Sequence, residues 1–175
     1  MILYHGTYID IRSIDLDRCM PYKDFGKGFY LTDIEQQARD MAIRKSKFVP
    51  KSSPHVLKYE FDENYLKDGT LQVKIFEGST EEWAQFIIAN RYNPENRVVH
   101  DYDVVIGPIA DDGVALQIGL FKDGFIDLAA LTKALEYKKL NKQYYFGTVK
   151  AVNLLKRIRL FSAKHRQSDG CLSDG

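Results

Sequence analysis

The sequence predicts an α+β fold. Segments typical of strands and segments typical of helices are mixed along the chain, without the strict alternation that builds a doubly wound parallel sheet. The chain has 175 residues, of which 45% are apolar and 28% charged, which suits one soluble domain with a substantial core. We expect that domain over residues 1–160, followed over residues 161–175 by a flexible tail rich in Ser, Asp and Gly.

The first third of the chain alternates short strands and a helix. The apolar run at residues 1–4 predicts a strand that ends at His5-Gly6-Thr7, and the aromatic segment 28–32 predicts a second strand. Asp33 with Gln36 three residues later forms a capping box, which predicts a helix. Apolar residues recur at helical spacing after it, at Ile34, Ala38, Met41 and Ala42.

The rest of the chain continues in the same mixed manner. Two strands are predicted at residues 55–62 and 71–78, and Ser79 with Glu82 opens a helix that runs to about Tyr92. The near-continuous apolar segment 103–110 predicts a central strand. Helices are expected around residues 114–121 and 127–140, then a strand at 143–149 and a short amphipathic segment at 152–158.

Charge and cysteine content exclude several classes of protein. The formal net charge is +1, so the chain has no overall electrostatic attraction for nucleic acid or anionic membranes. Cys19 and Cys171 lie far apart and form no C-x-x-C pair, which argues against a disulfide framework or a metal site. The first ten residues turn polar too early for a signal peptide, and no apolar run approaches a membrane span. We therefore expect a cytoplasmic protein that binds no metal and no membrane.

The stretch DFGKGFYLTD at residues 24–33 is the first unusual segment. Its glycine pair, Gly26 and Gly28, does not continue to the third glycine of a dinucleotide-binding loop, because Leu31 stands there. The pair also precedes a strand, whereas nucleotide loops follow one. The simplest interpretation is a tight turn in which glycine supplies a positive φ angle.

Two side chains near this turn have both a structural and a functional interpretation. His5 is a capped or surface histidine unless the fold brings it a partner. Tyr30 alternates with Phe29 and Leu31, so it faces a cleft or solvent if those two residues face the core. A tyrosine in that position offers a stacking surface to a flat or cationic ring.

Three ordered segments together resemble the ADP-ribosyltransferase superfamily, in its His-Tyr-Glu branch that includes diphtheria toxin and the poly(ADP-ribose) polymerases. They are YHGT at residues 4–7, FGKGFYLTD at 25–33 and NKQYYFGT at 141–148. The chain to about Arg159 also resembles an uncharacterised bacterial family assigned to that superfamily. That second likeness adds the segments WAQFIIANR at 83–91 and YDVVIGPIADD at 102–112.

The resemblance implies split, antiparallel-rich sheets with flanking helices around a cleft for NAD, used as co-substrate. It implies that His5 bonds the adenosine ribose, that Gly6 holds the nicotinamide carboxamide through its backbone, and that Tyr30 stacks on the nicotinamide ring. Lys27 and the turn at Gly28 would shape the cleft wall. Thr7 and Met41 complete the implied cofactor-binding set.

Two positions depart from the superfamily pattern. The third catalytic position is Gln143 rather than glutamate, so the side chain can hydrogen-bond a ribose hydroxyl but supplies no negative charge to an oxocarbenium-like transition state. Met41 stands where the polymerases carry a second stacking tyrosine, which argues against synthesis of ADP-ribose chains. Asp112 and its neighbour Asp111 end a predicted strand, and a compensating role for Asp112 stays open.

Three functions follow from this pattern. The first is a mono-ADP-ribosyltransferase that modifies a macromolecule, as a bacterial toxin with a possible cognate antitoxin. The second is an NAD glycohydrolase, in which water is the acceptor. The third is a catalytically inactive module that binds NAD or ADP-ribose, which the glutamine at position 143 favours.

Overall fold

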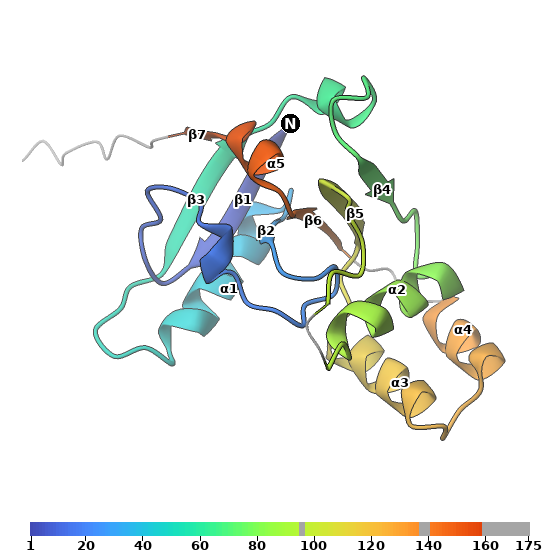
Figure 1. Ribbon diagram of the computed structural model, residues 1–175. Helices are drawn as coiled ribbons and strands as arrows, with labels where there is room; N and C mark the ends of the chain where they lie inside the picture. Colours follow the sequence, from blue (N-terminus) through green and yellow to red (C-terminus); the bar gives the residue numbers. More distant parts are fainter. Residues whose placement is uncertain (95–96, 137–140, 159–175) are drawn as a thin grey trace, which may run out of the picture.

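Two β-sheets and five α-helices form the part of the chain that the computed structural model describes, residues 1–94, 97–136 and 141–158 (Figure 1). The three-stranded sheet has the order β1 (Ile2–Thr7), β3 (His55–Glu60), β7 (Lys156–Ile158), and both of its pairings are antiparallel. The four-stranded sheet has the order β2 (Phe29–Leu31), β6 (Lys142–Phe146), β5 (Val104–Pro108), β4 (Val73–Ile75). Only the β4–β5 pair among these strands is parallel, so the expected α+β class with antiparallel-rich sheets is confirmed.

The two sheets meet at a single isolated bridge between Tyr4 and Thr32. The Tyr4 amide donates to the Thr32 carbonyl at 2.7 Å, and the Thr32 amide donates back to the Tyr4 carbonyl at 2.9 Å. This bridge fixes the end of β2 against the middle of β1. It therefore sets the relative position of the segments that carry YHGT and GFYLT.

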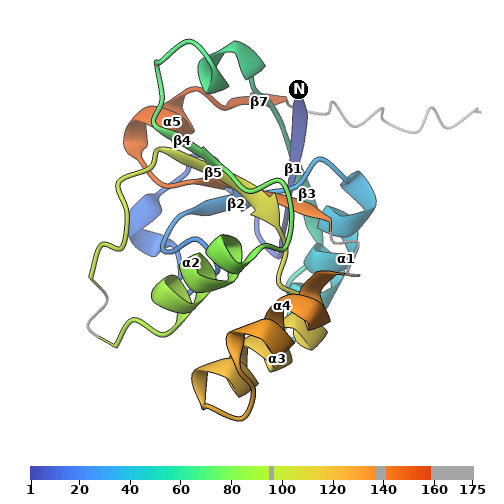
Figure 2. The same cartoon turned by 90° about the vertical axis from the view of Figure 1, so that its right-hand side faces the viewer.

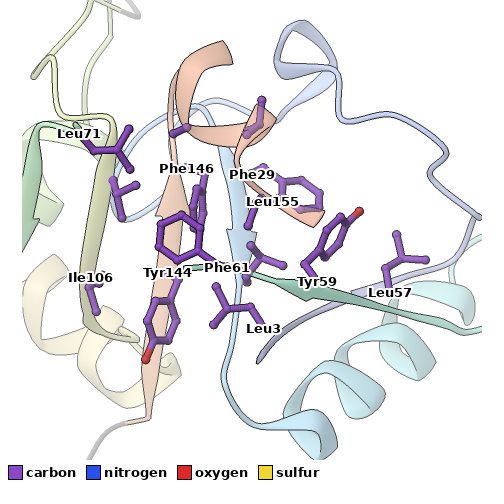
Figure 3. Packing of buried hydrophobic residues seen from close by; sticks show 14 residues of the cluster. Leu3, Phe29, Leu57, Tyr59, Phe61, Leu71, Ile106, Tyr144, Phe146 and Leu155 are labelled. Atoms are coloured by element: carbon purple, nitrogen blue, oxygen red, sulfur yellow. The ribbon is translucent and has the colours of Figure 1, made fainter. Parts of the chain in front are cut away.

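A first apolar core fills the space between the two sheets. Figure 3 shows side chains of the three-stranded sheet, such as Leu3 and Tyr59, meeting side chains of the four-stranded sheet, such as Tyr144 and Phe146. Strand alternation sends Phe29 and its partner Phe146 to this side. The face of the four-stranded sheet that carries these two residues is therefore buried in the first core.

A second apolar core lies on the opposite face of the four-stranded sheet. It is covered by α2 (Glu81–Arg91), α3 (Asp112–Lys122) and α4 (Leu128–Glu136), which gather on one side of the molecule (Figure 2). Trp83 of α2 is fully buried here, and its indole N–H donates to the Pro108 carbonyl at 3.2 Å. Val105 and Tyr145, which alternate with the residues of the first core, belong to this second one.

The other helices cover the three-stranded sheet and its surroundings. Helix α1 (Glu35–Ser46) packs on β1 through Ala38 and Ala42, and α5 (Val149–Asn153) leads into β7. Two short 3-10 helices at Leu16–Arg18 and Glu63–Leu66 were not expected from the sequence. Within the described residues, no helix is both long enough and apolar enough to cross a membrane.

Most predicted elements are confirmed, and two of the differences lie at helix starts. The central position of β5 is confirmed. The prediction that Asp33 caps α1 is wrong: Ile34 is the cap residue, and the Thr32 hydroxyl accepts the Ile34 amide instead. Helix α2 is capped by Thr80 rather than Ser79, because the Thr80 hydroxyl accepts the Trp83 amide.

The C-terminal predictions have mixed outcomes. The amphipathic segment 152–158 divides into the end of α5 and strand β7. The helix expected at 127–140 is α4, which ends at Glu136, and residues 137–140 lie outside the described part. The expected tail at 161–175 also lies outside it. Asp111 caps α3 by accepting the Val114 amide, and Asp112 is the first residue of that helix.

Candidate functional site

His5 and Tyr30 lie next to each other because β1 and β2 meet at the Tyr4–Thr32 bridge. The His5 Nδ1 atom is 2.7 Å from the Tyr30 carbonyl oxygen. A carbonyl only accepts hydrogen bonds, so Nδ1 carries the proton and donates it. In the neutral imidazole, Nε2 is then the hydrogen-bond acceptor of the ring.

The surroundings of His5 keep it neutral. Its ring stacks on Phe29 with 4.4 Å between centroids and 28° between planes. Burial, with a smaller contribution from the positive charge of Lys45, lowers the pKa of His5 to about 4. At neutral pH the residue is therefore an uncharged donor–acceptor pair and not a cation.

The Tyr30 hydroxyl is bound to the turn that precedes its own strand. It donates to the Gly26 carbonyl at 2.7 Å and accepts the Phe25 amide at 3.0 Å. Its half-buried ring packs edge-on against Tyr145, with 5.4 Å between centroids. Burial raises the pKa of this hydroxyl far above that of free tyrosine, so Tyr30 stays protonated. The ring lies on the face opposite Phe29, as alternation predicts. It packs against the second core and does not face open solvent.

The turn at residues 24–28 has the geometry that the glycine pair predicts. Gly26 has a φ of +91°, which favours glycine, and its amide donates to the Lys23 carbonyl at 3.1 Å. Gly28 is buried, and a Cβ there would lie 2.2 Å from the Tyr145 ring. Lys27 points outward, 4.0 Å from an Asp17 carboxylate oxygen. The turn interpretation of this pair is confirmed.

The other residues implied to bind the cofactor lie along β1 and α1. A Cβ on Gly6 would lie 2.0 Å from the Ala38 carbonyl oxygen, so the strand and the helix touch here through their backbones. The Gly6 carbonyl accepts the Lys45 ammonium at 2.8 Å. Thr7 is buried at the end of β1, and the half-buried Met41 accepts a bond from Arg44 through its sulfur.

Gln143 is held by two acceptors at the start of β6. Its side-chain nitrogen donates to Asp24 Oδ2 at 2.7 Å and to the Pro108 carbonyl at 3.2 Å. Both partners can only accept, so the orientation of the amide is determined by chemistry. Tyr145, two residues along the strand, packs on Tyr30. Gln143 and Tyr30 therefore lie on the same face of the four-stranded sheet.

Asp24 is the centre of a buried charge cluster that the sequence did not reveal. It is only 7% exposed. The Arg91 guanidinium binds its Oδ1 through two nitrogens, at 2.7 and 2.6 Å, and the Ala110 amide donates to Oδ2 at 3.2 Å. With Gln143 the carboxylate accepts three hydrogen bonds and forms an ion pair with Arg91, so its charge is compensated despite burial.

The cluster joins residues from four of the motif segments. Asp24 begins DFGKGFYLT, Arg91 ends WAQFIIANR, Ala110 lies in YDVVIGPIADD and Gln143 begins QYYFGT. The only signal that could have identified Asp24 and Arg91 beforehand is their position, since each is a charge at the end of an apolar segment. The four segments meet at one carboxylate.

The three side chains of the expected triad do not touch one another, although they come from neighbouring strands. Within the described part of the chain, no hydrogen bond or ring contact joins the side chains of His5, Tyr30 and Gln143 directly. His5 lies toward Phe29, whereas the other two side chains lie on the face of the second core. Their link runs through the backbone of β2.

Two hollows open near this region. One of about 570 Å³ lies along β3 and β7. Its wall contains Leu57, the partner of His5 across the sheet, together with His55 and four charged residues: Asp10, Arg12, Lys58 and Arg157. Another of about 480 Å³ lies between α1 and the three-stranded sheet. Among the described residues, no group of three or more His, Cys, Asp or Glu side chains could hold a metal ion.

A family model with the description "Protein of unknown function (DUF3990)" matches residues 1–157. The chain belongs to the DUF3990 family. The match covers all four segments that meet at Asp24, so the charge cluster lies within the extent of the DUF3990 family. No curated protein and no solved structure matches the chain significantly.

Proposed function

We propose that this protein binds NAD beside strand β2 and acts as a mono-ADP-ribosyltransferase on a macromolecular acceptor. The observation that carries the proposal is the placement of His5, Tyr30 and Gln143 on three neighbouring strands, β1, β2 and β6. The same three residue positions carry the resemblance to the His-Tyr-Glu branch. The two antiparallel-rich sheets agree with the split-sheet fold that this resemblance implies.

The polarity of the side chains supports the same substrate. His5 offers an uncharged acceptor at Nε2, which suits a ribose hydroxyl. In the hollow next to its strand partner Leu57, the basic side chains of Arg12 and Lys58 suit the diphosphate of a dinucleotide, whereas Arg157 there is paired with Asp10. Both features lie on the three-stranded sheet side of β2.

In the proposed reaction the bond between the nicotinamide nitrogen and C1′ of the ribose breaks first, and nicotinamide leaves with the bonding electrons. A nucleophile of the acceptor then forms a bond to the oxocarbenium-like centre at C1′ and releases its proton to solvent. Gln143 would bond the ribose 2′-hydroxyl and orient the sugar. Because a glutamine adds no charge, we expect slow turnover, with a rate reduced on the order of 100-fold relative to a glutamate site.

Incubation of the purified protein with host lysate and NAD labelled in the adenylate part tests the proposal. We expect both label transfer to macromolecules and release of nicotinamide, and we expect Gln143→Ala to abolish them. Gln85→Ala, which removes an exposed glutamine on α2, is the matched control and should leave both signals unchanged. A folded protein that releases no nicotinamide and transfers no label would contradict the transferase proposal.

An inactive module that binds NAD or ADP-ribose is the second candidate function. The hydrogen bonds of Gln143 favour it, because both amide hydrogens are taken by Asp24 and the Pro108 carbonyl and position 143 carries no carboxylate. Calorimetric binding of NAD without nicotinamide release would select this function. Free ADP-ribose without modified macromolecules would instead select an NAD glycohydrolase.

On the same resemblance, we propose that the protein is a toxin that a cognate antitoxin neutralises. This part rests on the family likeness alone. Expression of the chain in a bacterial host, with and without the product of the neighbouring gene, tests it. Growth arrest that the neighbour relieves, and that Gln143→Ala abolishes, is the expected result.

A further inference from the structure

Asp24 determines which end of the Gln143 side-chain amide is exposed. Both hydrogens of the Gln143 amide point to buried acceptors, Asp24 Oδ2 at 2.7 Å and the Pro108 carbonyl at 3.2 Å. The remaining polar atom of the side chain is Oε1. Across the described residues, none donates to it, and no described buried side-chain oxygen or nitrogen lacks a partner. Because Gln143 is half-buried, Oε1 is the accessible end of the amide.

Asp24 is itself too constrained to turn. Two nitrogens of Arg91 hold Oδ1, and the Ala110 amide holds Oδ2, so the carboxylate cannot rotate without breaking a charged pair that is mostly buried. The rotamer of Gln143 is then fixed by a partner that is itself fixed. Such preorganisation is what a binding site needs in order to discriminate a donor from an acceptor.

We propose that Asp24 is a positioning residue that holds Gln143 with Oε1 outward, so that this position accepts a hydrogen bond from a ligand hydroxyl and cannot donate one. The inference rests on the proposed function for the identity of the ligand. A carboxylate and an amide oxygen have the same acceptor polarity toward a hydroxyl. Toward a ligand hydroxyl, the glutamine therefore presents the same acceptor as an acidic residue, without its charge.

The proposal predicts a specific pattern of ligand discrimination. The wild type should bind NAD at least about tenfold more tightly than an analogue whose nicotinamide ribose lacks the 2′-hydroxyl, since one hydrogen bond is lost in a preorganised site. Asp24→Asn puts a donor or a neutral acceptor in place of Oδ2 and releases the amide. This variant should bind both nucleotides with affinities within about twofold of each other.

Asp103→Asn is the matched control. Asp103 is also only 7% exposed, and it also accepts backbone and side-chain hydrogen bonds, from the Gln72 amide and the Thr148 hydroxyl, but it does not contact Gln143. If Asp24 acts only as a structural carboxylate, the two variants should reduce stability and binding alike. Discrimination that is lost in Asp24→Asn and kept in Asp103→Asn is the expected result, and equal discrimination in both variants would overturn the proposal.

A second measurement keeps the positioning claim separate from the proposed function. The side-chain NH₂ of Gln143, assigned by its loss in Gln143→Ala, should give two ¹⁵N-correlated signals protected from solvent exchange in the free protein. Protection should vanish in Asp24→Asn and persist in Asp103→Asn. If the wild type binds neither nucleotide, the proposed function fails, while the NH₂ signals still decide whether Asp24 holds the amide; unprotected signals in the wild type would overturn that claim.

Discussion

Gln143 differs from a glutamate in its hydrogen-bond donors as well as in its charge. Its amide satisfies Asp24 and the Pro108 carbonyl at once, because it brings two donors to two acceptors. A carboxylate at the same place would face another carboxylate and a carbonyl with no proton to share. The charge cluster and the glutamine are therefore one unit, and the contacts with Asp24 and Pro108 give a structural reason for an amide at position 143.

Gln143→Glu should consequently destabilise the fold in a pH-dependent manner. The neighbouring Asp24 carboxylate raises the pKa of the introduced carboxyl above its unfolded value. A raised folded-state pKa gives stability that is present at low pH and lost as pH rises through it. Urea unfolding from pH 4.5 to 8 should show a loss of about 1 to 3 kcal/mol that grows toward pH 8.

The control for that series is Gln85→Glu, at an exposed position of α2. It should change the free energy of unfolding by no more than about 0.5 kcal/mol at any pH in the range. Equal stability of Gln143→Glu and wild type at pH 8 would show that the amide does not face Asp24 in solution. The pair Asp24→Asn with Gln143→Glu should recover part of the loss, since one member is again neutral.

His5 should make the protein less stable in mild acid. Its pKa of about 4 in the folded state lies below the ordinary value of 6.5, so the unfolded chain binds a proton that the folded chain does not. Stability is complete above about pH 6.5 and falls as pH drops toward 4, by up to about 1.4 kcal/mol per pH unit. The slope of unfolding free energy against pH should be shallower in His5→Gln than in the wild type.

An NMR titration checks the same prediction directly. The His5 ring signals should titrate with a midpoint near pH 4, and the Nε2–H tautomer should be absent at neutral pH because Nδ1 carries the proton. His55→Gln, a substitution on the neighbouring strand β3, serves as the control and should leave the His5 midpoint in place. A His5 midpoint near 6.5 would contradict the burial that the fold gives this ring.

At the scale of elements, the contact between β1 and α1 leaves no room for a side chain at Gly6. Gly6 meets the Ala38 carbonyl and the Ala42 amide with no side chain between the two backbones. Gly6→Ala should therefore push the helix away from the strand, at a cost of about 1 to 3 kcal/mol. Gly78→Ala is the control, because a Cβ at Gly78 meets nothing within 4 Å. Thermal unfolding of both variants distinguishes the contact from a general effect of replacing glycine.

Element identity was readable from the sequence where one local pattern decides it. The alternation of Phe29, Tyr30 and Leu31 predicted that Tyr30 lies on the face opposite the other two, and the apolar run of β5 predicted a central strand. The expectation that Tyr30 faces a cleft or solvent did not include the second core, against which its ring packs. The prediction that Asp33 caps α1 failed because the helix begins one residue later, after Ile34, and the Asp33 carboxylate instead accepts a bond from the Tyr144 hydroxyl. Local capping patterns do not include such long-range partners.

The candidate site was only partly readable for the same physical reason. His5 and Tyr30 were singled out by type and by resemblance, and the fold brings them within one hydrogen bond. Asp24 lies 67 residues from Arg91 and 119 from Gln143, so no periodicity connects them. Buried charge pairs of this kind are specified by tertiary structure, and a single sequence contains no direct trace of them.

At the scale of the whole molecule, the four-stranded sheet is shared by both cores. Successive residues of its strands point into opposite cores, so a substitution that destabilises one core should also destabilise the other. Trp83 is the only tryptophan and lies in the second core, whereas Phe61 lies in the first. The molecule therefore contains a natural reporter on the far side of the sheet.

Phe61→Ala should lower the stability of the entire described domain by about 3 to 5 kcal/mol. Its effect should appear equally in Trp83 fluorescence and in far-ultraviolet circular dichroism, with coincident midpoints in urea. Leu116→Ala, at an exposed position of α3, is the control and should leave both midpoints within error of the wild type. Separate midpoints for the two probes in Phe61→Ala would show that the two cores unfold independently.

The pairing of β2 with β6 has a consequence for biosynthesis. Asp24 leaves the ribosome with its partner Gln143 still 119 residues away, which at 5 to 20 residues per second is a delay of about 6 to 24 s. Throughout that interval β2 has no strand beside it on the β6 side, and the carboxylate lacks one of its ligands. A nascent or prematurely terminated chain that stops before β6 therefore lacks both the β2–β6 pairing and the bond from Gln143 to Asp24, and the proposed activity would require chains synthesised almost to the end of the family match.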